Sequence, residues 1–240
     1  MLKYFIVGIA IFSSSILSAQ QLSGNQLLDN AINYHDPQGK WSTFKGKFVI
    51  EMTTPEKTPR LTLLELNFPK DYFKATVRKK PNTVEYILDK DSCNLKLNYS
   101  EVIADHYRDS LQINCGRAKM LKNYYTYLYG LPMKLKDAGT NVDPTVIKKK
   151  FKGKDYLRLK VTYDANVGKD IWYFYFDPNT YAMEVYQFYH DESKNDGEYI
   201  LLSDILEVNG INMPKTRAWY YNKDNTYLGT DVLLKGGPLK

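Results

Sequence analysis

The chain has 240 residues, of which 43% are hydrophobic and 14% aromatic, and tyrosine alone fills 21 positions. A chain of this length folds as one domain or at most two, and it can bury a core without depending on disulfides or metals. Its net charge of +6 comes from basic and acidic residues scattered along the sequence, which argues against a nucleic-acid-binding surface. Tyrosine is frequent in strands, so the composition favours a β-rich protein.

The first 19 residues are typical of a secretory signal peptide. Lys3 precedes the apolar run YFIVGIAIF, and a region of small residues, SSSILSAQ, follows it. The apolar run is too short for a transmembrane helix, although an uncleaved membrane anchor is the alternative. We therefore predict cleavage after Ala19, export to the periplasm (or secretion as the alternative), and a single mature domain over residues 20–240.

The two cysteines are Cys93 and Cys115. An even number of cysteines in an exported chain predicts a disulfide, with two buried free thiols as the alternative. The bridge would close a loop of about twenty residues, which is worth about 3 kcal/mol in the chain-entropy model. No paired histidine lies near them in the sequence, so we predict no metal site, and nothing in the sequence indicates a cofactor.

Near the mature amino terminus, Leu27, Leu28, Ala31 and Ile32 share one face of a short amphipathic helix that ends before Pro37. Strands then follow almost without interruption. Each has β-forming residues at alternate positions, and short groups of turn residues separate one strand from the next. The turns are of hairpin length, so neighbouring strands should pair antiparallel. The strands predicted in this half span 43–52, 60–68, 72–79, 83–89 and 92–99.

A helical insertion at about 101–135 interrupts the strands, with helices at 101–110 and 117–129 and a loop over 132–144. The second helix carries apolar and aromatic residues on two faces. It is either a lid over an apolar cavity or a helix that completes the core with its tyrosine hydroxyls reaching water. The candidate ligand-binding residues in this segment are Tyr124, Tyr125, Leu128, Tyr129 and Leu131.

Strands resume after the insertion, and Asn209–Gly210 predicts a type I′ hairpin turn between two of them. Trp172, Phe174 and Phe176 share one strand face, and we assign them, with Trp219, to a concave ligand-binding surface. The alternative is that this row only packs against the helices. The strands predicted in this half span 145–151, 155–163, 169–176, 182–190, 197–208, 211–222 and 226–234.

These elements predict a mainly β (α+β) domain. About twelve consecutive antiparallel strands form one large curved sheet, a sandwich or a barrel. Several strands are apolar or aromatic on both faces, which favours a sheet covered on both faces or one whose concave face holds something apolar.

The histidines do not form a recognisable catalytic motif. Tyr-His-Asp occurs twice, around His35 and His190, and both copies lie beside turn residues, so we interpret both histidines as solvent-exposed. His106, in a polar helix, is interpreted in the same way. The sequence contains no nucleophile elbow, no H-E-x-x-H and no Gly-rich phosphate loop, so we predict no catalytic residue. A hydrolase with an unrecognised site is the least favoured hypothesis.

Three stretches carry a resemblance to known families. WYFYFDPNTYAMEVYQF (172–188) and EVNGINMPKTRAWYY (207–221) resemble hairpins of the lipoprotein-carrier superfamily, the LolA/LolB-like proteins. YYTYLYGLPMKLKDAGT (124–140), with YHDPQGKWSTFKG (34–46), resembles an uncharacterised family of exported Bacteroidota proteins described as similar to outer-membrane lipoprotein-sorting proteins. The likeness covers residues 25–235.

This resemblance implies a single curved antiparallel sheet of about 11–12 strands that forms an incomplete, half-open β-barrel covered by a few helices. It also implies an exported, soluble, monomeric and non-enzymatic carrier that holds a lipid, an acyl chain or another hydrophobic molecule in the concave face. Envelope lipoproteins or the membrane surface are the implied larger partners. The alternative is a cell-envelope structural or interaction protein with a filled core and a tyrosine-rich binding surface.

Overall fold

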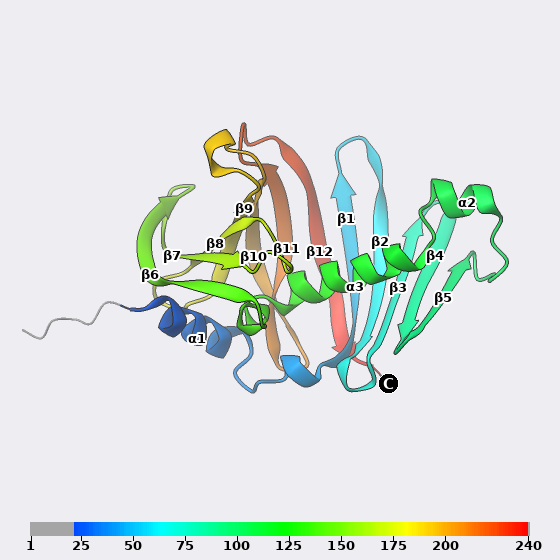
Figure 1. The fold of residues 1–240 in the computed structure, drawn as a ribbon, viewed down its shortest axis with the longest axis horizontal. Coiled ribbons are helices and arrows are strands. Elements are labelled where there is room, and N and C mark those ends of the chain that lie inside the picture. Colours follow the sequence, from blue (N-terminus) through cyan, green and yellow to red (C-terminus); the bar gives the residue numbers. More distant parts are fainter. Residues whose placement is uncertain (1–21, 240) are drawn as a thin grey trace, which may run out of the picture.

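A computed structural model describes residues 22–239, and the predicted signal peptide, residues 1–19, lies outside the described residues. The fold is one antiparallel sheet of 12 strands that curves around its helices without closing into a barrel (Figure 1). This confirms the predicted half-open barrel. The strands are β1 (Lys45–Thr54), β2 (Lys57–Asn67), β3 (Tyr72–Lys79), β4 (Asn82–Asp89), β5 (Ser92–Leu97), β6 (Thr140–Phe151), β7 (Lys154–Tyr163), β8 (Ile171–Phe176), β9 (Met183–Tyr189), β10 (Glu198–Val208), β11 (Ile211–Tyr221) and β12 (Tyr227–Pro238).

The strand order in the sheet is β5-β4-β3-β2-β1-β12-β11-β10-β9-β8-β7-β6. Strands that follow one another in the chain are therefore neighbours in the sheet, except β5 and β6, which lie at opposite edges. At the centre, the first strand pairs with the last. Gly46 of β1 lies opposite Pro238 of β12, and the register runs on to Thr53 opposite Thr230. The edges of the sheet are the two strands that flank the helical insertion, β5 and β6.

The described helices lie against the concave face and near both edges of the sheet. They are α1 (Gly24–His35), α2 (Asp105–Ser110) and α3 (Cys115–Gly130), with short 3-10 turns between strands. Figure 1 shows α1 beside β6, α3 crossing the concave face, and α2 near β4 and β5. None of the helices within residues 22–239 is long and apolar enough to cross a membrane.

The amino-terminal helix forms where its sequence pattern predicts it. Ser23 accepts a hydrogen bond from Gln26 N while the Gln26 side chain accepts one from Ser23 N, which is a capping box. Leu27, Leu28 and Ala31 are fully buried, as the amphipathic pattern requires.

The predicted boundaries are wrong in the helical insertion. The first helix begins at Asp105 rather than near residue 101, and the predicted loop at 132–144 contains a 3-10 turn (Met133–Lys136) and the start of β6. Thr140 pairs with Tyr163 of β7, so hairpin pairing extends this strand through a segment whose own sequence favours a loop. The Asn209–Gly210 turn forms as predicted, with φ of 54° and 84°.

Cys93 and Cys115 form the predicted disulfide, with their Cα atoms 6.1 Å apart. Cys93 lies on β5 and Cys115 is the first residue of α3, where the Asn114 side chain accepts a hydrogen bond from Arg117 N. The bridge therefore ties the start of α3 to the edge of the sheet that it covers.

Candidate functional site

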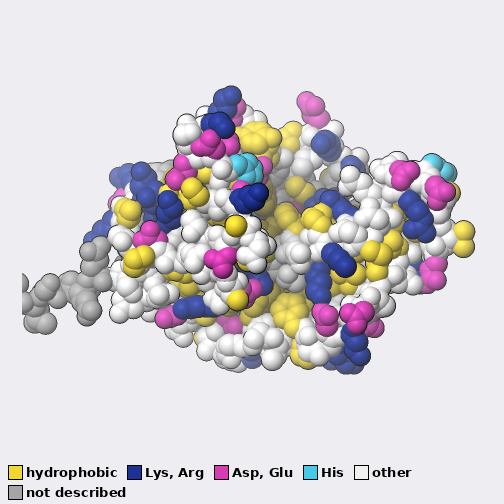
Figure 2. Space-filling view, in the orientation of Figure 1, with side chains coloured by type: hydrophobic (Ala, Val, Ile, Leu, Met, Phe, Trp, Pro, Cys, Tyr) yellow, Lys and Arg dark blue, Asp and Glu magenta, His cyan; other side chains and the backbone are white. Residues whose placement is uncertain are grey.

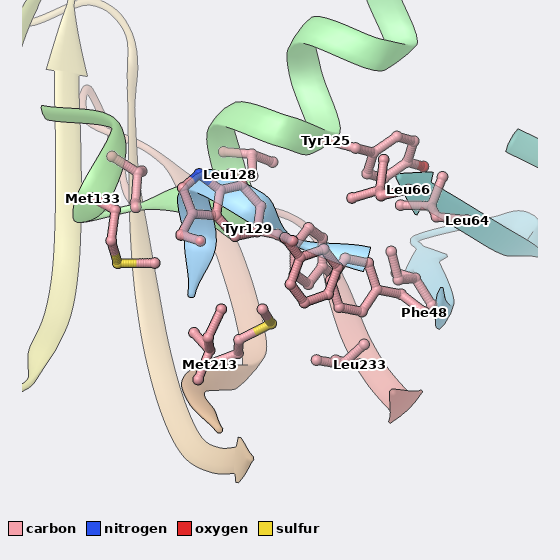
Figure 3. Close-up of a cluster of buried hydrophobic side chains, with 14 of the residues drawn as sticks. Phe48, Leu64, Leu66, Tyr125, Leu128, Tyr129, Met133, Met213 and Leu233 are labelled. Carbon is pink, nitrogen blue, oxygen red and sulfur yellow. The ribbon is translucent and has the colours of Figure 1, made fainter. Parts of the chain in front are cut away.

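The inward face of α3 fills the centre of the concave surface. Tyr125, Leu128 and Tyr129 point from the helix toward the sheet and pack among side chains from four strands (Figure 3). All three are at most 4% exposed, so the helix completes the core at this level rather than covering an open space. The other residues labelled in Figure 3 are Phe48, Leu64, Leu66, Met133, Met213 and Leu233.

The remaining predicted ligand-binding residues lie on the same concave side. Leu131, just beyond α3, is buried, and Tyr124 is half-buried beside Tyr125. The two phenylalanines of the β8 row, Phe174 and Phe176, are fully buried.

The two tryptophans are half-buried on this side. Trp172 packs on Phe188 with ring centroids 4.8 Å apart and contacts Tyr127 of α3 at 5.5 Å. Trp219 lies edge-on to Tyr186. The sheet therefore brings the predicted residues of β8 and β11 to the concave face that α3 covers.

A buried arginine, which the sequence interpretation missed, supports the end of α3. Arg217 of β11 is 1% exposed and its guanidinium stacks on the Tyr129 ring, 4.1 Å from the centroid. Its Nη1 donates to Pro214 O at 2.9 Å and its Nη2 to Leu128 O at 3.4 Å. Leu128 O is one of the last four carbonyls of the helix, which have no partner within it, and a cation is favourable at this negative end of the helix dipole.

Asp231 of β12 lies directly across the sheet from Arg217. It is 3% exposed. Burial raises the pKa of its carboxyl, and the positive charges of Arg60 and Arg217 offset part of this rise. The concave face therefore holds a buried polar cluster beneath α3. Within residues 22–239, the buried polar atoms of this cluster without a hydrogen-bond partner are Arg60 Nε, Tyr129 Oη, Tyr186 Oη, Arg217 Nε, Trp219 Nε1 and Asp231 Oδ1.

The sequence did hold a signal for these two charges. Arg217 lies at even spacing on β11 from Ile211 and Met213, which are apolar and buried, with the half-buried Lys215 between them. Asp231 alternates in the same way with Leu233. A charged residue at an inward position of a long strand is the pattern that marks a buried polar group.

A pocket of about 420 Å³ opens beside this filled centre, between the helical insertion and the concave face of β2, β3 and β4. Strands form one apolar wall of the pocket and helices form the opposite wall. Tyr125 both lines the pocket and packs in the core, and its hydroxyl donates to Thr62 Oγ1 at 3.3 Å. The residues that line the pocket are Arg60, Val77, Lys79, Lys80, Asn82, Val84, Tyr86, Ser110, Leu111, Gln112, Arg117, Leu121 and Tyr125.

The interpretation of His35 as a solvent-exposed turn histidine is wrong. The end of α1 packs into the sheet, so the ring is fully buried, with Nδ1 2.6 Å from Asn212 O and Nε2 accepting from Met183 N at 2.9 Å. Nδ1 therefore carries the proton and donates to Asn212 O. Burial lowers the pKa of His35 from 6.5 to about 4, so the imidazole is neutral at pH 7 and acts as a structural link.

We expect His35 to make the protein acid-sensitive. The unfolded histidine binds a proton below pH 6.5 whereas the folded one does so only below about pH 4, so stability is full above pH 6.5 and falls as the pH drops toward 4. The loss is about 3 kcal/mol across this window. Urea unfolding at several pH values should show that His35→Gln loses less stability than the unaltered protein as the pH drops. The exposed control His106→Gln should behave like the unaltered protein. Equal pH profiles for all three proteins would contradict this expectation.

The other two histidines are exposed, as predicted. Nδ1 of His190 lies 2.7 Å from Asp170 Oδ1, and this hydrogen bond raises the pKa of His190. In the part of the chain that the structure describes, no group of three or more His, Cys, Asp or Glu residues could hold a metal ion.

Comparison with known proteins identifies relatives by sequence family and by fold. The model of a family described as "Family of unknown function (DUF6503)" matches residues 3–236. A comparison with curated proteins finds no match.

Three crystal structures share the fold at low sequence identity, so the likeness concerns the fold alone. A LolA superfamily protein from Nitrosomonas europaea is 10% identical with a TM-score of 0.52, over 91% of this chain and 94% of that one. A putative outer membrane lipoprotein-sorting protein domain from Vibrio parahaemolyticus is 14% identical with a TM-score of 0.51, over 89% and 91%. A DUF1329 family protein from Desulfovibrio piger is 8% identical with a TM-score of 0.51, over 90% and 92%.

Proposed function

This chain belongs to the DUF6503 family of unknown function, and from this premise we propose that it is an exported, non-enzymatic carrier that holds a hydrophobic ligand. The fold that it shares with a LolA superfamily protein and with a lipoprotein-sorting domain supports a carrier of the periplasm. A lipid or an acyl chain is the ligand class, and envelope lipoproteins or the membrane surface are the corresponding donors and acceptors.

The pocket between the helical insertion and the sheet is the observation on which this proposal depends. Its volume of about 420 Å³ falls within the range of roughly 300–1,000 Å³ that is usual for ligand sites. Val77 and Val84 form one wall, and Leu111 and Leu121 of the insertion form the other. Each methylene of an acyl chain buried between these walls would contribute about 0.8 kcal/mol, so a single chain could be held with useful affinity.

The location of the pocket refines the predicted ligand-binding surface. Tyr125 lines the pocket directly, whereas Leu128 and Tyr129 lie deeper, in the filled centre. We therefore propose that the amino-terminal half of α3, together with α2, covers the ligand, and that the carboxyl-terminal half anchors the helix to the sheet.

Filling the pocket should abolish binding. We expect Leu111→Trp to weaken the binding of a neutral fluorescent probe, N-phenyl-naphthylamine, by at least ~10-fold, because the indole occupies space that the probe needs. Leu111 is half-buried at the pocket wall, so the added bulk should leave the fold intact. Ile147→Trp is the matched control, since Ile147 is exposed on β6 and does not line this pocket.

The same titration tests the carrier hypothesis as a whole. Protein purified from its own host should carry a co-purifying lipid in native mass spectrometry, and this lipid should be displaced by the probe. An absence of both lipid and probe binding would rule out a hydrophobic carrier, and equal binding by Leu111→Trp and the unaltered protein would place the ligand elsewhere.

A further inference from the structure

We propose that the ligand of this pocket is an anionic amphiphile, a single acyl chain that ends in a carboxylate or a phosphate. This inference rests on the proposed carrier function and names the chemical class of the ligand. Its basis is the combination of an apolar interior with a group of positive charges in a pocket whose lining holds no aspartate or glutamate.

Four cations line the pocket, and they come from three parts of the fold. Arg60 belongs to β2, Lys79 ends β3 and Lys80 follows it in the turn to β4, and Arg117 lies in the first turn of α3. The pocket lining includes no aspartate or glutamate. The acidic group that faces Arg60 is Asp231, which lies in the core beneath α3 and is not part of the lining.

These four charges are not neutralised by ion pairs. Among residues 22–239, ten ion pairs engage other basic side chains, such as Lys74 with Glu85 and Lys122 with Asp71, but none includes a cation of this pocket. Arg60 uses Nη2 to contact Met52 Sδ at 2.9 Å, and its buried Nε has no hydrogen-bond partner within the described chain.

The arrangement of polar and apolar groups suits a molecule with one charged end. Figure 2 shows basic and hydrophobic side chains side by side over the lobe that contains α2 and β3–β5. Lys79 is exposed and Arg117 half-buried, whereas Val84 and Leu121 are buried. Lys79, Lys80 and Arg117 therefore lie at the solvent-facing part of the pocket, and the apolar side chains form its interior. A head group would lie among these charges while its chain lies between helix and sheet.

The Tyr86 hydroxyl adds a neutral hydrogen-bond donor to the same pocket. Burial raises the pKa of Tyr86, so its phenol stays protonated at neutral pH. Tyr86 lines the pocket together with Tyr125, whose own hydroxyl donates to Thr62 Oγ1. A carboxylate or phosphate oxygen, which only accepts hydrogen bonds, is complementary to the Tyr86 donor, whereas the hydroxyl of a fatty alcohol gains less from it.

The test compares ligands that share a chain and differ only in charge. Palmitate is paired with hexadecanol, and lysophosphatidic acid with the corresponding monoacylglycerol, each titrated below its micelle concentration by displacement of N-phenyl-naphthylamine. We expect each anion to bind at least ~10-fold more tightly than its neutral partner, with the preference reduced at high salt. A larger preference in the second pair identifies a phosphate head group, and a larger preference in the first identifies a carboxylate.

Matched variants assign the preference to this pocket. Lys79→Gln combined with Arg117→Gln should reduce the anion-to-neutral affinity ratio at least ~5-fold, because both charges are lost. Lys148→Gln combined with Lys149→Gln removes two exposed charges from β6 and should keep the ratio of the unaltered protein. Equal affinities for anion and neutral partner, or an unchanged ratio in the first double variant, would overturn the anionic head group while leaving the carrier intact. If none of the probes binds, the carrier function itself fails.

Discussion

Arg217→Ala should lower the free energy of unfolding by about 3–5 kcal/mol, because the substitution removes one member of a buried charged cluster. Four losses combine in this variant. The carbonyls of Pro214 and Leu128 each lose a hydrogen bond, the Tyr129 ring loses the stacked guanidinium, and Asp231 is left buried with one fewer opposing charge. Urea unfolding followed by tyrosine and tryptophan fluorescence measures the change.

Arg78→Ala serves as the control for this substitution. Arg78 is an exposed arginine of β3, and its removal should change the stability by no more than about 0.5 kcal/mol. Arg217→Lys keeps the charge but cannot reproduce the stacked, planar donor, so its stability should lie between those of the unaltered protein and Arg217→Ala. A loss below about 1 kcal/mol for Arg217→Ala would show that this arginine does not anchor α3.

Leu128→Ala should destabilise the protein by about 2–5 kcal/mol, because it leaves a cavity in the filled centre of the concave face. Leu128 is 4% exposed and packs between α3 and the sheet (Figure 3). On the same helix, Met120 is 39% exposed, and Met120→Ala should change the stability by no more than about 0.5 kcal/mol. Thermal or urea unfolding of the two variants compares the two faces of one helix directly.

The Leu128→Ala result also decides between the two roles open to α3. A large loss of stability would establish that the carboxyl-terminal half of the helix belongs to the core. A nearly unchanged stability with lost probe binding would instead make this half of the helix a movable cover. The first outcome is compatible with ligand binding at the other end of α3, where Leu121 and Tyr125 line the pocket.

The strands were the most predictable part of the fold, because alternation and turn chemistry act over a few residues. β3 spans Tyr72–Lys79, as predicted, and the Asn209–Gly210 turn has the backbone conformation that its sequence favours. The boundaries failed at 132–144, where pairing with β7 sets the start of β6. Pairing is a tertiary effect that local sequence does not contain.

The candidate site was less predictable than the fold, because it depends on residues far apart in the chain. The aromatic residues of α3 and β8 were recognised from their spacing, but the spacing cannot distinguish a filled core from an open pocket. His35 was misassigned because the neighbouring Asp and Pro suggest a turn at the surface, whereas α1 carries the ring into contact with Asn212 and Met183. The four pocket cations come together only through the pairing of β2 with β3 and the packing of α3.

The pairing of β1 with β12 also constrains how the chain can acquire its structure. β1 is made well before β12, so the centre of the sheet forms only after β12 has been made. Until then, the meander of β1–β5 carries an unpaired inner edge that could associate with other chains. A chain kept unfolded until β12 has been made avoids this exposure, and the pairing of β1 with β12 then joins two meanders into one sheet.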